Sequence, residues 1–207
     1  MNIFLLMYLT LCVLHISFQS EHMRWPSRIS KVLLMPVLLI YYLTLNTDTG
    51  IYTLLITLAL LLGTAGDAFM AGGSKKRNFY AGMFSFFVGH LAYITYFALH
   101  LQSWGYFLFA MLALAFPLYK IILSFFPSQE TPFLSIYAAI LFILFAFCAS
   151  ALSLIAMAGA IFFAISDYLI AMGTIEKRTF SNATIMATYA LAQLLLIVGI
   201  LTLQGAF

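Results

Sequence analysis

The sequence contains very little charge. Only 7% of its 207 residues are Asp, Glu, Lys or Arg, whereas 65% are hydrophobic and the mean hydropathy is +1.09. Soluble domains carry about 25% charged residues, because polar groups have to cover their water-facing surface. The composition therefore excludes a soluble protein, and the formal net charge of +3 gives no indication of nucleic-acid binding.

Cysteine is also scarce. The two cysteines, Cys12 and Cys148, both lie inside apolar runs. A cysteine in such a place usually packs as a small hydrophobic residue, so we expect no disulfide. No set of His, Cys, Asp or Glu has the spacing of metal ligands. We expect neither a metal nor a cofactor.

Long apolar runs take the place of charge. Each holds roughly 20 residues, enough for a helix to cross a hydrocarbon core of about 30 Å. We expect an all-α integral membrane protein in which residues 1–207 form a single transmembrane domain. The run after residue 133 is long enough for two crossings, so we expect it to break near Ser153. The eight predicted transmembrane helices cover residues 3–19, 29–45, 51–72, 79–99, 104–125, 133–152, 154–173 and 183–204.

The basic residues predict the topology. All of them lie in or beside odd-numbered loops, and loops rich in Lys and Arg stay on the cytoplasmic side. We therefore expect both termini outside or in the periplasm, and we expect the chain in the cytoplasmic (inner) membrane. The residues concerned are Arg24, Arg28, Lys31, Lys75, Lys76, Arg77, Lys120, Lys177 and Arg178.

Two aspartates, Asp67 and Asp167, interrupt the third and seventh apolar runs. Both runs lead toward the cytoplasm, which puts the two carboxylates at similar depth and suggests a four-plus-four parallel repeat. An ionised carboxylate is costly against lipid, so we expect both to face the interior of the helix bundle as the working carboxylates. Each is followed by a basic pair and then an aromatic residue (Lys76-Arg77 and Phe79; Lys177-Arg178 and Phe180).

Small residues share a helical face with each aspartate, and such faces let neighbouring helices approach closely. The alternative is that each aspartate only locks helices together through hydrogen bonds to serine or tyrosine. The residues that share the face are Gly63 and Ala71 for Asp67, and Ala160, Ala164 or Phe163, and Ala171 for Asp167.

Three further groups of polar residues are candidates for a supporting role. On the eighth helix, Tyr189 and Gln193 continue a stripe from Asn182 and Met186. This stripe either positions water or a substrate head group beside Asp167, or joins helices by hydrogen bonds.

The fourth helix offers Asn78, Ser85 and Gly89 on one face and His90 beside it. His90 either orients a carboxylate or shuttles a proton, or is a histidine whose hydrogen bonds are satisfied inside the bundle.

Lys31 begins the second helix, where it either meets a lipid phosphate or extends to the membrane surface. The other histidines, His15, His22 and His100, fall near helix ends, and we expect them at the membrane interface.

Short motifs follow one another along the chain: Lys31 with Leu33-Leu34-Met35-Pro36, then Gly66-Asp67, then Phe84 to Tyr93, then Ser166-Asp167, then Tyr189 with Ala192-Gln193. In this order they resemble the YhhN or lysoplasmalogenase family. The resemblance covers nearly the whole chain, although Val32 replaces an expected proline and Thr64-Ala65 departs from the usual run before Gly-Asp.

The resemblance implies an eight-helix membrane hydrolase that uses both aspartates. Its substrate would be a lysoplasmalogen, whose vinyl ether bond is cleaved to a fatty aldehyde and glycerophosphoethanolamine or glycerophosphocholine. Protonation of the vinyl ether and capture by water need one acid and one base. Two carboxylates in a poorly solvated site do not both ionise readily, so one stays protonated as the acid. The sequence leaves open which one.

A proton-coupled transporter is the alternative, because buried aspartates in a parallel repeat suit it as well. Broken helices would be its signature. Only Pro36 and Pro117 interrupt the apolar runs, and neither lies beside an aspartate. An intramembrane aspartyl protease is a weaker rival, because Asp67 follows Thr64-Ala65-Gly66 instead of Gly-x-Gly and no Pro-Ala-Leu occurs. The balance favours the hydrolase.

Overall fold

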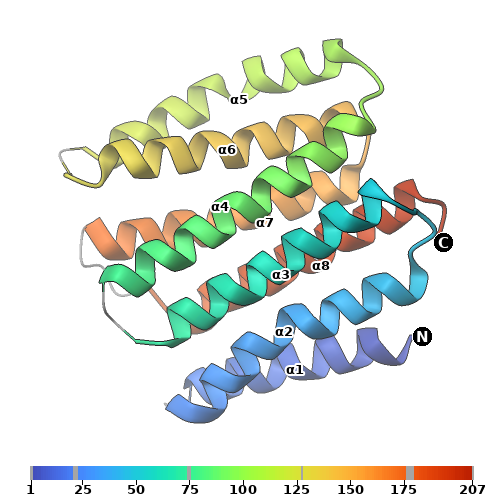
Figure 1. Cartoon of the computed structure of the whole chain (residues 1–207). Coiled ribbons are helices and arrows are strands. Elements are labelled where there is room, and N and C mark those ends of the chain that lie inside the picture. Colours follow the sequence, from blue (N-terminus) through green and yellow to red (C-terminus); the bar gives the residue numbers. More distant parts are fainter. Residues whose placement is uncertain (1, 21–22, 74–75, 127, 176–179, 207) are drawn as a thin grey trace. The chain divides into compact units, whose positions relative to one another are not determined.

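Over the residues that the structure describes, the chain forms eight α-helices (Figure 1). A computed structural model describes residues 2–20, 23–73, 76–126, 128–175 and 180–206. The predicted number of helices is confirmed, and their ends differ from the prediction by a few residues. The helices are α1 (Ile3–Ser20), α2 (Arg24–Leu45), α3 (Ile51–Ala71), α4 (Lys76–Leu99), α5 (Trp104–Ser124), α6 (Thr131–Ser150), α7 (Leu154–Ile175) and α8 (Asn182–Leu203).

Seven of the helices, α2 to α8, are long and apolar enough to cross a membrane. The chain is therefore a multi-pass integral membrane protein. Helix α1 is also apolar but shorter, over Ile3–Gln19, so its crossing stays a prediction. The parallel repeat and the orientation of the termini stay predictions as well. Of the residues behind them, Lys75, Lys177 and Arg178 lie outside the described residues, as does His22.

The break between α6 and α7 lies where the length of the apolar run predicted it. Leu152 takes a positive φ of 58°, the left-handed conformation that commonly ends a helix. The amide of Ser153 then donates to the Cys148 carbonyl at 3.1 Å, closing the last turn of α6. The Ser153 hydroxyl accepts from the Ala156 amide at 3.4 Å and so caps the start of α7. A serine cap therefore starts α7 without any charge, glycine or proline at the break.

The chain divides into two compact units, Met1–Tyr96 with Gln204–Phe207, and Phe97–Leu203. In the first unit, a group of hydrogen bonds ties the C-terminal residues to the loop between α2 and α3. Asp48 Oδ2 accepts from Gln204 Nε2 at 2.8 Å and from the Tyr96 hydroxyl at 3.0 Å. Thr47 Oγ1 donates to the Gln204 carbonyl at 3.3 Å.

Small residues bring α3 and α4 together in the first unit. A Cβ added to Gly89 would lie 3.3 Å from the Ala59 carbonyl oxygen, and one added to Gly66 would lie 2.8 Å from the Phe86 ring. The buried face of α3 follows a helical spacing that ends at Asp67. Its members are Ile56, Ala59, Leu60, Gly63, Gly66 and Asp67. This face turns the Asp67 side chain into the interior of the unit.

Helices α7 and α8 pack through glycines in the second unit. A Cβ added to Gly199 would lie 2.6 Å from the Ala156 amide nitrogen, and one added to Gly159 would lie 2.8 Å from the Leu196 amide nitrogen. The nearest atoms belong to the backbone, which cannot swing aside as a side chain can. Close approach of this kind replaces hydrophobic packing as the main source of helix association inside a membrane.

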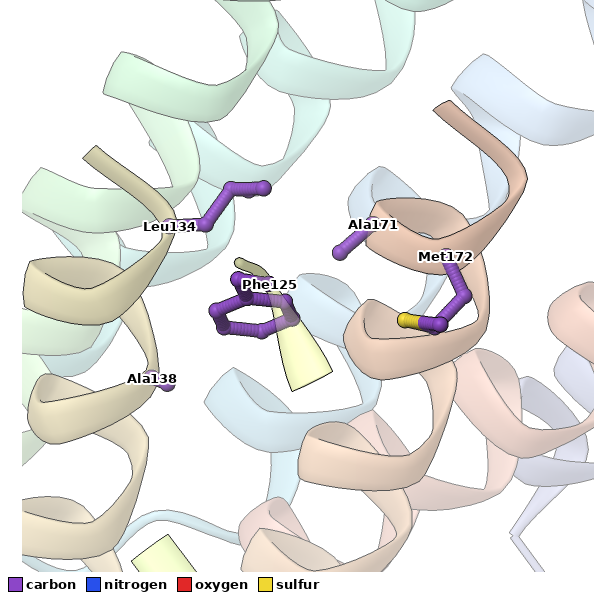
Figure 2. Close-up of a cluster of buried hydrophobic side chains, with 5 residues drawn as sticks. All are labelled: Phe125, Leu134, Ala138, Ala171 and Met172. Atoms are coloured by element: carbon purple, nitrogen blue, oxygen red, sulfur yellow. The ribbon is translucent and has the colours of Figure 1, made fainter. Parts of the chain in front are cut away.

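A cluster of buried side chains holds the last turns of α7 in place (Figure 2). The Phe125 ring, just after α5, lies between α6 on one side and α7 on the other. Thr131 Oγ1 donates to the Phe125 carbonyl at 2.6 Å, which joins the end of α5 to the start of α6. The Tyr168 ring lies 6.3 Å from the Phe125 ring between centroids. The cluster comprises Phe125, Leu134, Ala138, Ala171 and Met172, and it fixes the part of α7 that carries Asp167.

Replacing Gly199 by alanine should destabilise the second unit. Alanine is the better helix former by about 1 kcal/mol, but its Cβ would press on the Ala156 backbone. Overpacking of this kind typically costs about 1–3 kcal/mol. Thermal unfolding in detergent should show a lower melting temperature for Gly199→Ala. Ala187→Leu, on the exposed side of the same helix, should leave it unchanged. Equal or higher stability of Gly199→Ala would contradict the close packing.

Candidate functional site

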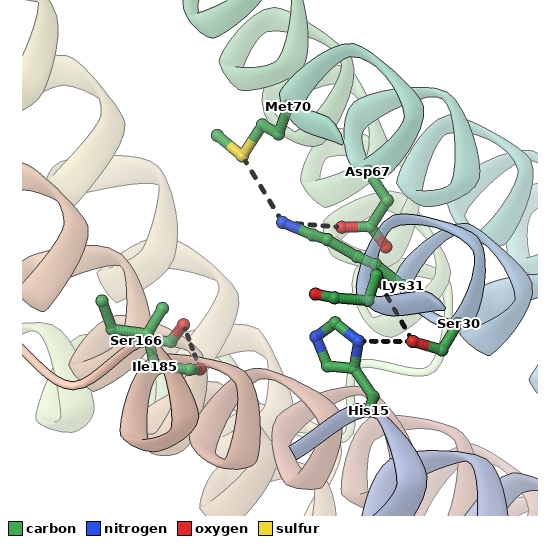
Figure 3. A network of polar contacts seen from close by, with 8 residues as sticks. His15, Ser30, Lys31, Asp67, Met70, Ser166 and Ile185 are labelled. Carbon is green, nitrogen blue, oxygen red and sulfur yellow. Dashed lines mark hydrogen bonds and ion pairs between the residues drawn. The ribbon is translucent and has the colours of Figure 1, made fainter. Parts of the chain in front are cut away.

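The buried carboxylate of Asp67 is paired with Lys31 (Figure 3). Lys31 extends from α2 toward α3, and its Nζ lies 3.5 Å from Asp67 Oδ1. Asp67 is fully buried, whereas the Lys31 side chain is 17% exposed. The Met70 sulfur lies 4.0 Å from the same nitrogen. The structure thus brings together two of the residues predicted for the site.

The ion pair gives a physical reason for an aspartate in this place. A lone ionised carboxylate inside a bundle is strongly unfavourable, and a cation beside it offsets the loss of hydration. Of the two expectations for Lys31, a lipid phosphate or the membrane surface, neither included Asp67 as its partner.

Helix α1 contributes two polar side chains to the same region. The buried Tyr8 hydroxyl interacts electrostatically with Asp67. His15 is also buried, with Nδ1 2.7 Å from the Ser30 hydroxyl on α2. Ser30 donates its own proton to the Ser27 carbonyl at 3.0 Å, so we assign the imidazole proton to Nδ1 as the donor. Figure 3 shows the ring beside Lys31.

The burial of His15 reveals a contact that we did not expect, while its position at the membrane interface stays a prediction. It is 1% exposed and faces α2. A signal was present in the sequence: Tyr8, Cys12 and His15 follow the spacing i, i+4, i+7 and so share one face of α1. The contact with Ser30 comes from α2 and so could not be predicted from α1 alone.

The second aspartate has different neighbours. Asp167 is half-buried, with one carboxylate oxygen fully buried, and the Tyr137 hydroxyl on α6 interacts with it electrostatically. Ser166, rather than Asp167, lies on the fully buried face of α7. Its hydroxyl donates to the Ile185 carbonyl on α8 at 3.2 Å (Figure 3). Asp167 therefore lies at the edge of the face expected for it, turned toward α6.

The polar stripe of α8 is buried except at its first residue. Met186, Tyr189 and Gln193 are each less than a tenth exposed, whereas Asn182 is exposed. The Tyr189 ring meets the Phe163 ring of α7 edge to face, with centroids 5.6 Å apart. The stripe therefore faces the helix that carries Asp167. The role of Tyr189 and Gln193 in a reaction stays a prediction.

On α4, His90 and Ser85 are buried, while Asn78 is half-buried. The Asn78 amide nitrogen lies beside Gly72, where a Cβ would be 3.2 Å away, and so packs against the end of α3. The roles predicted for His90 and Asn78 stay predictions. Across the described ranges, no group of three or more His, Cys, Asp or Glu could hold a metal ion.

A protein-family model described as the YhhN family matches residues 27–200. The chain belongs to the YhhN family. This family includes lysoplasmalogenases. No curated protein and no solved structure matches the chain. The YhhN match takes in Lys31, Asp67 and Asp167 but begins after α1, so Tyr8 and His15 lie outside it.

The Lys31–Asp67 pair can be tested by stability. Lys31→Met leaves the Asp67 carboxylate without its cation and should lower the unfolding free energy by about 2 kcal/mol, less than for a fully buried pair. Adding Asp67→Asn removes the charge as well, so the double variant should be more stable than Lys31→Met alone. Thermal unfolding of the single and double variants measures this.

The matched control is Lys120→Met. Lys120 is exposed, and its Nζ lies over the Phe116 ring, 5.5 Å from the ring centroid. Its loss should change the stability by less than about 0.5 kcal/mol. If Asp67→Asn does not improve the stability of Lys31→Met, the two side chains do not interact in the folded protein.

Proposed function

We propose that this chain is a lysoplasmalogenase, a membrane hydrolase that cleaves the vinyl ether bond of lysoplasmalogens. The products are a fatty aldehyde and a glycerophospho-alcohol, glycerophosphoethanolamine or glycerophosphocholine. Membership of the YhhN family carries the proposal, because that family includes lysoplasmalogenases. The buried, ion-paired carboxylate of Asp67 supports it from the structure.

The reaction needs one proton donor and one anion. A proton is added to the β-carbon of the vinyl ether, and the double bond becomes an oxocarbenium ion. Water adds to this ion and gives a proton to the base, which leaves a hemiacetal. The hemiacetal collapses to the aldehyde and the free alcohol, so one water is consumed for each bond cleaved. General acid and base groups typically accelerate such steps by about 10²–10⁴-fold each.

We assign the two chemical roles to Asp67 and Asp167. Both lie in helices long enough to span the membrane, so the alkenyl chain of a lipid substrate has apolar surroundings beside them. Each has a defined polar neighbour, Lys31 for Asp67 and Tyr137 for Asp167. A carboxylate in a poorly solvated place needs polar partners of this kind. His90, Tyr189, Gln193 and Asn78 are proposed as supporting residues.

The assignment predicts the loss of aldehyde release on replacing either carboxylate. Asp67→Asn and Asp167→Asn each keep the size of the side chain but can neither donate the required proton nor carry the charge. Each variant should reduce aldehyde formation from a 1-alkenyl lysophospholipid by about 10²-fold or more. Aldehyde is measured with purified protein, and the melting temperature checks that the variants remain folded.

Asp48→Asn is the matched control, because Asp48 is the third aspartate of the chain and bonds to Gln204 and Tyr96. It should retain its activity. A saturated 1-alkyl ether analogue should give no product in any variant, since it has no double bond to protonate. Wild-type protein that releases no aldehyde would overturn the proposal. A pH-gradient-driven uptake that depends on Asp67 and Asp167 would then favour the proton-coupled transporter.

A further inference from the structure

The buried ring of His15, in the first unit, presents a hydrogen-bond acceptor that the protein itself does not use. His15 is 1% exposed, and its Nδ1 donates to the Ser30 hydroxyl at 2.7 Å. Because Ser30 gives its own proton to the Ser27 carbonyl, the imidazole proton belongs to Nδ1, and Nε2 is a bare acceptor. Among the residues that the structure describes, Nε2 has no hydrogen-bond partner. A buried polar atom in this condition is unfavourable and calls for a functional explanation.

The side chain of Lys31 lies next to this ring. His15 interacts electrostatically with Lys31, and Figure 3 shows the imidazole beside the lysine. A cationic ligand group is therefore disfavoured at Nε2, because the lysine ammonium would repel it. The neutral donor that a lipid head group can offer to Nε2 is a hydroxyl.

Lys31 keeps a donor for an anion. An ammonium has three N–H donors, and the contacts with Asp67 at 3.5 Å and the Met70 sulfur at 4.0 Å occupy at most two of them. Asp67 is fully buried, whereas the Lys31 side chain is 17% exposed, so an anion can approach the lysine from its exposed side. The anion of a phospholipid head group is its phosphate, which lysine commonly binds in proteins.

A phosphate donor beside a hydroxyl acceptor fits the glycerol part of a lysophospholipid. Such a lipid has a free hydroxyl on the middle carbon of glycerol, next to the carbon that carries the phosphate. A phosphate bound to Lys31 therefore brings this hydroxyl close to His15. A phospholipid with two chains has an ester in the same place, which has no proton to donate and is too bulky for a buried nitrogen.

We propose that His15 and Lys31 bind the head group of a lysophospholipid: Nε2 of His15 accepts from the free hydroxyl, and the Lys31 ammonium donates to the phosphate. His15 is then the residue that selects lipids with one chain over lipids with two. Because Nε2 is buried, the hydroxyl reaches it when the flexible Lys31 side chain beside it moves. The inference rests on the proposed lysoplasmalogenase function, whose substrate has both groups.

The first test measures binding without turnover, using a radiolabelled 1-alkyl lysophospholipid and its 2-deoxy analogue, which differs only by the hydroxyl. Purified wild type should bind the 2-deoxy analogue about 10-fold more weakly, because Nε2 then stays without a partner. His15→Asn has an amide that can replace Nδ1 as the donor to Ser30 but has no atom in the place of Nε2. It should bind the two ligands with nearly equal affinity. His15→Gln, whose amide oxygen can take the place of Nε2, should regain the preference for the hydroxyl.

The matched control is His100→Asn, in the second unit, which should discriminate between the ligands as wild type does. Equal affinity of wild type for the two ligands would overturn the proposal. A His15→Asn variant that binds both ligands more weakly but still prefers the hydroxyl would also overturn it, since His15 would then only hold α1 against α2.

The second test concerns Lys31 and the phosphate. Asp67→Asn serves as the parent, so that no carboxylate charge remains beside the ligand when the lysine is removed. The parent should bind the 1-alkyl lysophospholipid about 10-fold more tightly than 1-alkylglycerol, which has no phosphate. Adding Lys31→Met should remove most of this difference, whereas adding Lys120→Met should keep it. A preference for phosphate that survives Lys31→Met would contradict the assignment.

Binding and turnover together separate this inference from the proposed function. Wild type that prefers the ligand with the hydroxyl but releases no aldehyde from a 1-alkenyl lysophospholipid would overturn the proposed function and support the head-group site. Wild type that releases aldehyde but binds the two 1-alkyl ligands equally would overturn the head-group site alone.

Discussion

A carboxylate inside a bundle of apolar helices has to be paired or protonated, because ionisation without water or a counter-charge is strongly unfavourable. In the first unit this constraint is met by Lys31, whose ammonium lies 3.5 Å from Asp67. Other contacts in the unit hold the helices that carry this pair. Small residues on α3 let α4 approach closely, and the bond between His15 and Ser30 fixes α1 on α2.

Much of the fold could be predicted from the sequence, because the length of an apolar run depends only on the residues within it. Eight apolar runs predicted eight helices, and the one run without a charged or turn residue split where its length required. The helical spacing around Asp67 also placed its side chain on an interior face, since residues four apart share a face whatever the tertiary structure. These are the features that depend on one helix at a time.

The partners of the aspartates could not be predicted in the same way. Lys31 lies 36 positions before Asp67, and a long flexible side chain at a helix end can reach water, lipid or another helix with similar ease. Tyr137 likewise comes from a different helix than Asp167. The burial of His15 likewise depends on α2 and not only on its own position in α1. Pairing across helices is set by packing, and one sequence carries little information about it.

The similar sequences around the two aspartates gave no indication that their neighbours in space differ. Asp67 and Asp167 have similar flanking residues, yet one adjoins an ammonium and the other a hydroxyl. Flanking residues belong to the same helix as the carboxylate, whereas its neighbours in space come from other helices. Lys31 reaches Asp67 from α2 and Tyr137 adjoins Asp167 from α6, so two aspartates with similar local sequences have different surroundings.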